Sequence, residues 1–183
     1  MLWILVVIIA VGLIWLISAY NGLIRLRQRV KNGWSQINVQ LKRRYDLIPN
    51  LVETCKGYMK HEREVLENVT KARTQAIEVS GGAAEQAKAE NFLSQTLRSL
   101  FAVAENYPEL KANENMLKLQ EELTTTENRV SFARQHYNDQ VMKFNTKTEI
   151  FPTNLIAGAF GFSKKDFFQT EESAEREPVK VSF

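Results

Sequence analysis

The two histidines are the residues of this sequence whose type first suggests chemistry. A di-iron site in a helical bundle needs Glu-x-x-His units, and no glutamate stands three residues before either His61 or His136. The pair His61-Glu62 begins like the zinc-protease pattern His-Glu-x-x-His, but Val65 occupies the place of the second histidine. The spacing therefore predicts two polar helix residues, with no metal site, no cofactor and no catalytic residue.

A dense set of polar residues surrounds Pro49. Its members are Gln36, Asn38, Gln40, Arg43, Arg44, Asp46, Asn50 and Glu53. One interpretation is a solvated helix face with a polar layer that fixes the register of a helical bundle. Another is a partner-contact surface at the kink, where Arg43 or Arg44 pairs with Asp46 or with a carboxylate on the third helix. The members expected to make this contact are Arg43, Arg44, Asp46 and Asn50. An enzyme site between Arg43 and Glu53 is the third alternative, which a buried carboxylate with a raised pKa would favour.

The single cysteine and the paired glycines offer no further chemistry. Cys55 has no second cysteine with which to form a disulfide inside the chain, which fits a reducing compartment. It lies on an apolar helical stripe, so we expect a small buried core residue. Ser80-Gly81-Gly82 is a lone glycine turn and not a Walker-type loop. We therefore interpret it as a connector between helices.

The elements that must position these residues begin with an apolar stretch, Met1–Ile24, which contains no charged side chain. As a helix rising ~1.5 Å per residue it would cover about 36 Å, enough for a hydrocarbon core of about 30 Å. A secretory signal usually has a basic first region, a shorter apolar run and a small-residue cleavage site. Here the basic region is missing, the run is longer, and Ser18-Ala19 is a poor cleavage site. We therefore expect a retained transmembrane anchor.

The residues that flank the anchor predict its orientation. Seven basic residues follow it before the first acidic residue, Asp46, and no basic side chain precedes it. By the positive-inside rule the N-terminus faces outward and the body lies in the cytoplasm. The side chains expected at the membrane interface are Trp3, Trp15, Tyr20, Arg25, Arg27 and Arg29. A nucleic-acid patch would need interleaved aromatic residues, which these charges lack, so we expect contact with membrane lipid and not with nucleic acid.

An apolar stripe with helical spacing follows the anchor. Its members recur in steps of three and four residues: Leu23, Leu26, Val30, Trp34, Ile37, Leu41, Tyr45, Ile48, Val52, Cys55 and Met59. This spacing predicts that the membrane helix continues into a long cytosolic helix with a coiled-coil-like packing seam. Pro49 removes one backbone hydrogen bond. Because the stripe stays in phase beyond Pro49, we expect a bend there and a helix that ends only at Ser80-Gly81-Gly82.

Two more helices complete the prediction. One apolar face covers residues 83–106, Tyr107-Pro108 makes a break, and a third stripe runs from Pro108 to Glu149 before Phe151-Pro152. The fold class is therefore all-α: one N-terminal transmembrane helix continuing into a long antiparallel bundle of three to four helices. We expect an anchor at 1–24, the bundle at 25–151, an apolar C-terminal foot at 152–168 and an acidic, loosely ordered tail at 169–183.

The predicted foot is rich in glycine and phenylalanine and carries a basic pair, Lys164-Lys165. Its residues either pack on the bundle or dock on the membrane surface, on a partner or on another copy of the chain. The members expected to make such a contact are Asn154, Gly158, Phe162, Phe167 and Phe168. Since the third helix is expected to run antiparallel to the first, the foot should lie near the anchor.

Four long motifs resemble those of the LemA family. They are WSQINVQLKRRYDLIPNLVETCKGYMKHE at Trp34–Glu62, YPELKAN at Tyr107–Asn113, LQEELTTTENRVSFARQHYND at Leu119–Asp139 and FNTKTEIFPTNLIAGAFGF at Phe144–Phe162. The resemblance implies a bacterial inner-membrane protein with an N-terminal anchor and an antiparallel helical bundle. It also implies a family with no established enzymatic activity. LemA-like proteins are often associated with a heat-shock membrane zinc metalloprotease, which implies a protein partner of that kind.

These observations together predict a non-enzymatic scaffold or adaptor. The anchor would hold it in the bacterial inner membrane as a single-pass protein, and the cytosolic bundle would be presented to protein partners in envelope homeostasis. Two alternatives remain: a self-assembling structural membrane protein, consistent with an expected homo-oligomer, and an enzyme that uses the polar residues near Pro49. The sequence does not separate these three classes.

Overall fold

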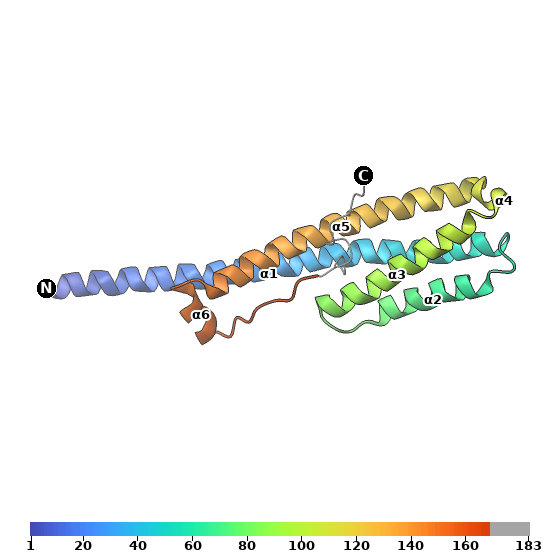
Figure 1. The fold of residues 1–183 in the computed structure, drawn as a ribbon. Helices are drawn as coiled ribbons and strands as arrows, with labels where there is room; N and C mark the ends of the chain where they lie inside the picture. The colour runs from blue at the N-terminus through green and yellow to red at the C-terminus, as the bar shows by residue number, and fades with distance from the viewer. Residues whose placement is uncertain (169–183) are drawn as a thin grey trace, which may run out of the picture. The chain divides into compact units, whose positions relative to one another are not determined.

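The computed structural model describes residues 1–168, and these are folded into helices joined by short connections (Figure 1). The helices are α1 (Leu2–Lys56), α2 (Arg63–Glu78), α3 (Ala83–Ala104), α4 (Pro108–Lys111), α5 (Glu114–Glu149) and α6 (Thr153–Ala159). No strand occurs among residues 1–168. The predicted all-α class is therefore confirmed. The predicted acidic tail, 169–183, lies outside the described residues.

The described residues divide into two compact units. Unit 1 contains residues 1–38 and 132–167, and unit 2 contains residues 39–131 with Phe168. Helices α1 and α5 each contribute one part to unit 1 and another part to unit 2. Each unit has its own set of contacts and is described separately below.

Helix α1 begins with a stretch of exposed, mostly apolar residues. Residues 1–18 are exposed, and by length and composition α1 is the one helix within residues 1–168 that is able to cross a membrane. Beyond this stretch the apolar stripe turns inward, because Leu23, Val30 and Ile37 are buried. The helix also continues through Pro49, as the phase of the stripe predicts.

The predicted length of this first helix is wrong, since α1 ends at Lys56 and not near Val79. The chain turns through residues 57–62, where the amides of Tyr58 and Met59 donate to the Cys55 carbonyl, at 3.0 and 2.8 Å. Gly57 follows Lys56 directly but has no positive φ, so α1 does not end in the left-handed glycine conformation common at helix stops. The apolar stripe does not reveal where α1 ends, because residues of α2 continue the same spacing and are buried in the same core.

The predicted third helix is also divided. Its first turn is the separate helix α4, and α5 begins at Glu114. Asn113 is the N-cap of α5, because its Oδ1 accepts a hydrogen bond from the Met116 amide at 3.1 Å. The predicted second helix, residues 83–106, agrees within two residues with α3. The helix α6 lies within the predicted foot, 152–168.

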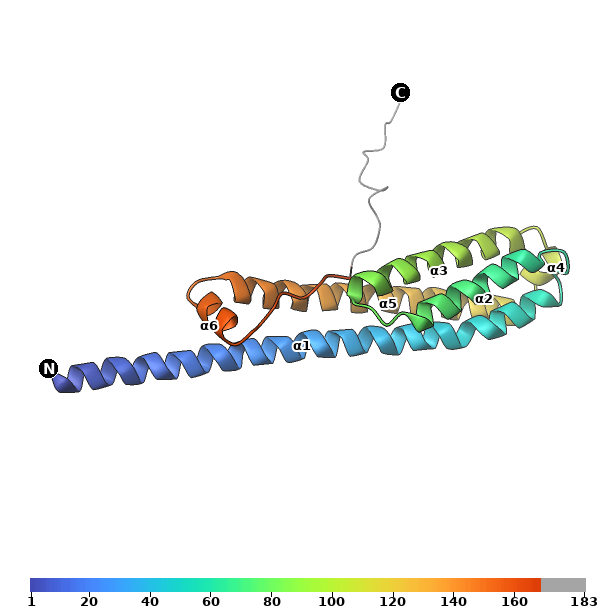
Figure 2. The ribbon, with the colours of Figure 1, turned by 90° about the horizontal axis from the view of Figure 1, so that it is seen from below.

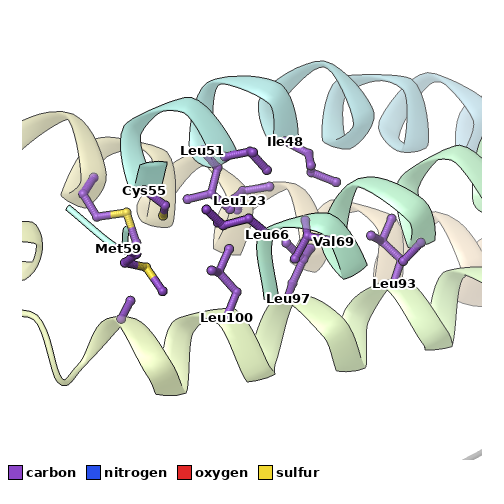
Figure 3. Close-up of a cluster of buried hydrophobic side chains, with 14 of the residues drawn as sticks. Ile48, Leu51, Cys55, Met59, Leu66, Val69, Leu93, Leu97, Leu100 and Leu123 are labelled. Atoms are coloured by element: carbon purple, nitrogen blue, oxygen red, sulfur yellow. The ribbon is translucent and has the colours of Figure 1, made fainter. Parts of the chain in front are cut away.

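The core of unit 2 is formed by α2 and α3, which lie side by side in Figure 2, with parts of α1 and α5. Figure 3 shows side chains of this core pointing toward one another between the helices. They are Ile48, Leu51 and Cys55 of α1, Leu66 and Val69 of α2, Leu93, Leu97 and Leu100 of α3, and Leu123 of α5. Each fully buried leucine contributes roughly 1.5–3 kcal/mol, so these contacts hold the four helices together.

Unit 1 pairs the earlier part of α1 with the later part of α5 and with α6. Gly33 lies against Tyr137, and a Cβ at position 33 would come 3.2 Å from the Tyr137 Cα atom. Nearer the start of α1, Leu23 is buried with Ile156 and Ala157 of α6. Earlier residues of α1 therefore contact later residues of α5 and α6, as in an antiparallel pair. The antiparallel arrangement predicted for these two helices is confirmed within unit 1.

Candidate functional site

Arg44 is the centre of a buried polar network in unit 2. It lies on α1 with only 2% of its surface exposed. Its Nη1 donates to Glu90 Oε2 of α3 at 3.2 Å and also lies 3.1 Å from Glu127 Oε2 of α5. Its Nη2 donates to Ser94 Oγ at 2.8 Å. One guanidinium thus connects three helices, and its buried charge is balanced by two carboxylates.

Glu90 is fully buried and has partners besides the arginine. Its Oε1 accepts hydrogen bonds from the Tyr45 hydroxyl and, at 3.0 Å, from Gln86 Nε2. The Gln86 amide group also donates to the Ala76 carbonyl of α2 at 3.0 Å. Burial, followed by the nearby Glu90 carboxylate, raises the pKa of Tyr45 well above its usual value of 10.0. Tyr45 therefore stays a neutral hydrogen-bond donor at physiological pH.

The backbone of Tyr45 is tied to the same region through Pro49. A proline has no amide hydrogen, so Pro49 cannot donate to the carbonyl four residues earlier, that of Tyr45. Arg73 of α2 replaces this donor, because its Nε donates to the Tyr45 carbonyl oxygen at 2.8 Å. The interruption in α1 thereby becomes a contact between α1 and α2.

The chemistry of this network favours a structural role. Its charged and polar groups are bonded to one another, so the buried charge of Arg44 is compensated inside the network. No group of three or more histidine, cysteine or carboxylate side chains within residues 1–168 is arranged to hold a metal ion. The arrangement fixes which faces of the helices meet, which is the register-setting role considered for the residues around Pro49.

The residues predicted around Pro49 separate into two groups. Arg43, Asp46 and Asn50 are exposed, and Asp46 pairs with Lys42 at 2.8 Å. Arg44 does not belong on a contact surface: burial places it inside unit 2. Of the two predicted partners for these arginines, Asp46 is wrong for Arg44, and a carboxylate on the third helix is right, namely Glu127.

Sequence reasoning missed the α3 side of the network. Gln86, Glu90 and Ser94 follow one another in steps of four, so they form one polar row along the helix. This row borders the apolar face of α3, where Leu93 and Leu97 are buried. A polar row at the edge of an apolar face was the available signal, and its spacing matches helical neighbours that share one face.

A groove of about 590 Å³ opens on another part of unit 2, between the end of α1 and α2. Its apolar lining comes from Val52, Met59 and Leu66, all of which are buried. Charged and polar residues line the remainder: Lys56, Lys60, Arg63, Glu67, Thr70 and Lys71. With four cations and one carboxylate, the groove combines an apolar floor with a basic rim. No residue of this groove was predicted as a site.

The foot of unit 1 is held by aromatic contacts. The Tyr20 ring centroid lies 4.9 Å from that of Phe160 and 5.8 Å from that of Phe162. The Arg27 guanidinium lies 5.4 Å from the centroid of the Phe162 ring, a cation–π geometry. Of the other residues predicted at the interface, Trp3, Trp15, Arg25 and Arg29 are exposed. Tyr20 therefore contacts both Phe160 and Phe162 of the foot, and Arg27 contacts Phe162.

The chain beyond α6 is fastened along α5. Asn145 forms two hydrogen bonds with the backbone of Lys165, each 2.9 Å long, and the Tyr137 hydroxyl donates to the Asp166 carbonyl at 3.0 Å. Lys164 forms an ion pair with Glu149. These contacts fix the path of residues 164–166.

The residues predicted for docking at the foot have different environments. Asn154 and Gly158 are exposed, and open space surrounds Gly158. Phe167 is 38% exposed, whereas only 2% of Phe168 is exposed. Phe168 is therefore a buried residue, which corrects the prediction that it offers a contact surface.

Over residues 1–168 the fold defines a class: an all-helical protein with one apolar helix that is long enough to cross a membrane. Comparison with known proteins gives the family: the LemA family model matches residues 33–183, and the chain belongs to the LemA family. Protein LemA of Metamycoplasma hominis is 25% identical, over 98% of this chain and 83% of the relative. The magnetosome proteins MamQ 2 of Paramagnetospirillum magneticum and MamQ of Magnetospirillum gryphiswaldense are 21% and 19% identical. Both of these alignments cover 87% of this chain and 68% of the relative.

The family and the apolar helix together indicate a membrane-associated protein. None of the names of these relatives is that of an enzyme. The resemblance seen in four sequence motifs is thus confirmed at the level of the family.

Proposed function

We propose that this protein is a membrane-anchored, non-enzymatic scaffold that presents its helical body to protein partners. The observation that carries the proposal is the contrast between two polar features of unit 2. The Arg44 network is buried and its groups bind one another, whereas the groove between α1 and α2 is open and lined by four cations. The charged groups of the Arg44 network bind one another inside unit 2, whereas the open groove is suited to binding a partner.

The composition of the groove defines the partner segment that fits it. An apolar floor accommodates aliphatic or aromatic side chains, while the basic rim attracts carboxylates. Two of the rim cations already have partners, because Lys56 lies 3.2 Å from Glu53 and Arg63 lies 2.8 Å from Glu67. Lys60 and Lys71 are exposed and give the rim its excess positive charge. We propose that an acidic segment with apolar side chains binds here.

Photo-crosslinking in native membranes tests this proposal. A photoreactive amino acid replaces Thr70, an exposed groove residue, in the full-length chain. The variant Lys60→Glu/Lys71→Glu should lose the crosslinked partner, because it reverses the charge of the rim. The matched control, Lys88→Glu/Lys118→Glu, makes the same charge change at exposed positions of unit 2 outside the groove and should keep it. Equal crosslinking by both variants would contradict the proposal.

The membrane zinc metalloprotease implied by the family resemblance is one partner to test in this experiment, by probing the crosslinked product with an antibody against it. Self-assembly gives a different result: the product would contain only this chain, and the mass of the detergent-solubilised particle would be a multiple of one chain. An enzyme acting near Arg43–Glu53 would lose activity on substitution of Asp46 or Asn50 with no loss of crosslinking.

We also propose the arrangement in the cell that the charges favour. The anchor at 1–24 crosses the bacterial inner membrane once, with the N-terminus outward, and the body and foot lie in the cytoplasm. The basic residues after the anchor support this orientation, since Arg25 and Arg29 are exposed beside the end of the apolar stretch.

A further inference from the structure

A patch of exposed apolar side chains surrounds α6 in unit 1. It consists of Ile150, Phe151, Leu155 and Phe160, whose exposed fractions are 45%, 78%, 64% and 56%. The opposite side of α6 is also apolar, because Ile156 and Ala157 are buried against Leu23. A short helix with one apolar face would be explained by packing on the protein alone. The exposed apolar side chains at and beside α6, called the α6 patch here, need another apolar environment.

The position of the α6 patch within unit 1 indicates that environment. Ala19 and Tyr20 of α1 pack against the same cluster as Ile156, and the Tyr20 ring lies 4.9 Å from that of Phe160. Residues 1–18, immediately before this contact, are exposed and apolar. The α6 patch thus adjoins the end of the stretch of α1 that is able to cross a membrane. Phe160 is the member of the patch that contacts this end of the stretch, through the Tyr20 ring.

The charges near the patch fit a lipid surface. Arg25 and Arg29 are exposed, and Arg27 covers the Phe162 ring. Lys164 is paired with Glu149, while Lys165 is exposed. Cations beside exposed aromatic and aliphatic side chains are typical of protein segments that lie in the interface between lipid headgroups and acyl chains.

We propose that the α6 patch inserts into the headgroup–acyl boundary of the bilayer that α1 crosses. The patch is a second membrane contact, made by a helix that lies in the interface and does not span it. A spanning helix alone leaves a protein free to rotate and tilt about that helix. Two contacts within one unit restrict the tilt of unit 1 relative to the membrane. This inference goes beyond the proposed scaffold role and does not depend on the groove.

Site-directed fluorescence in vesicles tests the inference with the full-length chain. Leu155→Cys is labelled with a fluorophore in a Cys55→Ala background, and the protein is reconstituted into vesicles of phosphatidylcholine mixed with phosphatidylglycerol. The control is Phe132→Cys, since Phe132 is also apolar, lies in unit 1 and is 72% exposed. It is roughly 27 Å from Ile150 along α5, at ~1.5 Å per residue. Circular dichroism shows whether each labelled variant keeps its helices.

The label at position 155 should be quenched by nitroxide-bearing lipids and shielded from iodide in the solvent. The label at position 132 should show the reverse pattern. A label at Phe151→Cys provides a second reading and should behave like the one at position 155. Labels at 151 and 155 that iodide reaches as freely as it reaches position 132 would overturn the inference. Shielding from both quenchers would also overturn it, because the cover would then be another copy of the chain.

Discussion

Arg44 is a charged side chain that is almost entirely buried. The free-energy cost of removing its charge from water is offset only while its partners are present. The guanidinium contacts Glu90, Glu127 and Ser94 at distances of 2.8–3.2 Å. Removing one member of a buried ion pair leaves the other charge without compensation, whereas replacing both with apolar residues is often tolerated. The role of the network can therefore be measured as stability.

The first prediction concerns this pair. Arg44→Leu should lower the free energy of unfolding by about 3–5 kcal/mol, because Glu90 stays buried as an unpaired carboxylate. Arg44→Leu/Glu90→Leu should recover a large part of the loss. Arg43→Leu is the matched control, since Arg43 is exposed on the same turn, and it should change stability by less than about 0.5 kcal/mol. Urea titrations in detergent, followed by circular dichroism, measure all three. An Arg44 variant as stable as the Arg43 control would show that the network does not hold unit 2 together.

Cys55 allows a prediction about pH. Burial raises the pKa of the Cys55 thiol to about 11, above its ordinary value of 9.0. Between these values the unfolded chain loses this proton and the folded chain keeps it, so stability falls as pH rises from 9 towards 11. Cys55→Ala should remove this part of the decline, which is on the order of 2 kcal/mol. Urea titrations of both chains at several alkaline pH values make the comparison. Burial also raises the pKa values of Tyr45 and Tyr137. Both tyrosines are present in both chains, so they do not contribute to the difference between the two curves. Parallel curves for the two chains would rule out a contribution from Cys55.

At the scale of elements, the stripe of apolar residues predicted α1 through Pro49 but could not show where α1 stops. Met59 and Leu66 continue its spacing, yet the chain reverses between them and both residues are buried in one core. Helical periodicity reports which residues face a core and not whether one helix or two present them. The signal for the start of α5 was Asn113, a single N-cap residue whose effect is local. The partners of Arg44 were hidden for a related reason: Glu90 is distant in sequence, and only packing brings it close.

The contact between α1 and α2 at Pro49 gives an element-scale prediction. Arg73→Met removes the donor to the Tyr45 carbonyl and should cost about 1–2 kcal/mol. In a Pro49→Ala background the new amide can donate to that carbonyl, so the same change should cost only a few tenths of a kcal/mol. High helicity should persist in Pro49→Ala, because α1 already continues through this position. The four chains form a double-mutant cycle measured by urea unfolding. Additive effects would mean that Arg73 does not act as the replacement donor.

At the scale of the whole molecule, the membrane organises the functional proposals. The exposed apolar stretch of α1 and the α6 patch both belong to unit 1. The basic-rimmed groove and the Arg44 network both belong to unit 2. Lipid contact and partner contact are thus assigned to separate parts of the chain. A variant that weakens one need not unfold the other, which allows the two proposals to be tested independently.

The last prediction is the side of the membrane on which the body lies. Seven basic residues lie between the apolar stretch and Asp46, and the positive-inside rule places such residues in the cytoplasm. Phe132→Cys in a Cys55→Ala background provides an exposed reporter. In spheroplasts, a membrane-impermeant maleimide should leave it unlabelled until the inner membrane is permeabilised. A cysteine placed at Met1, which is exposed at the other end of the span, should be labelled without permeabilisation. Replacing Arg25, Arg27, Arg29 and Lys31 with glutamine and adding lysines before Leu2 should shift labelling towards the reverse pattern. Immediate labelling of the Phe132→Cys reporter in the otherwise unchanged chain would place the body outside.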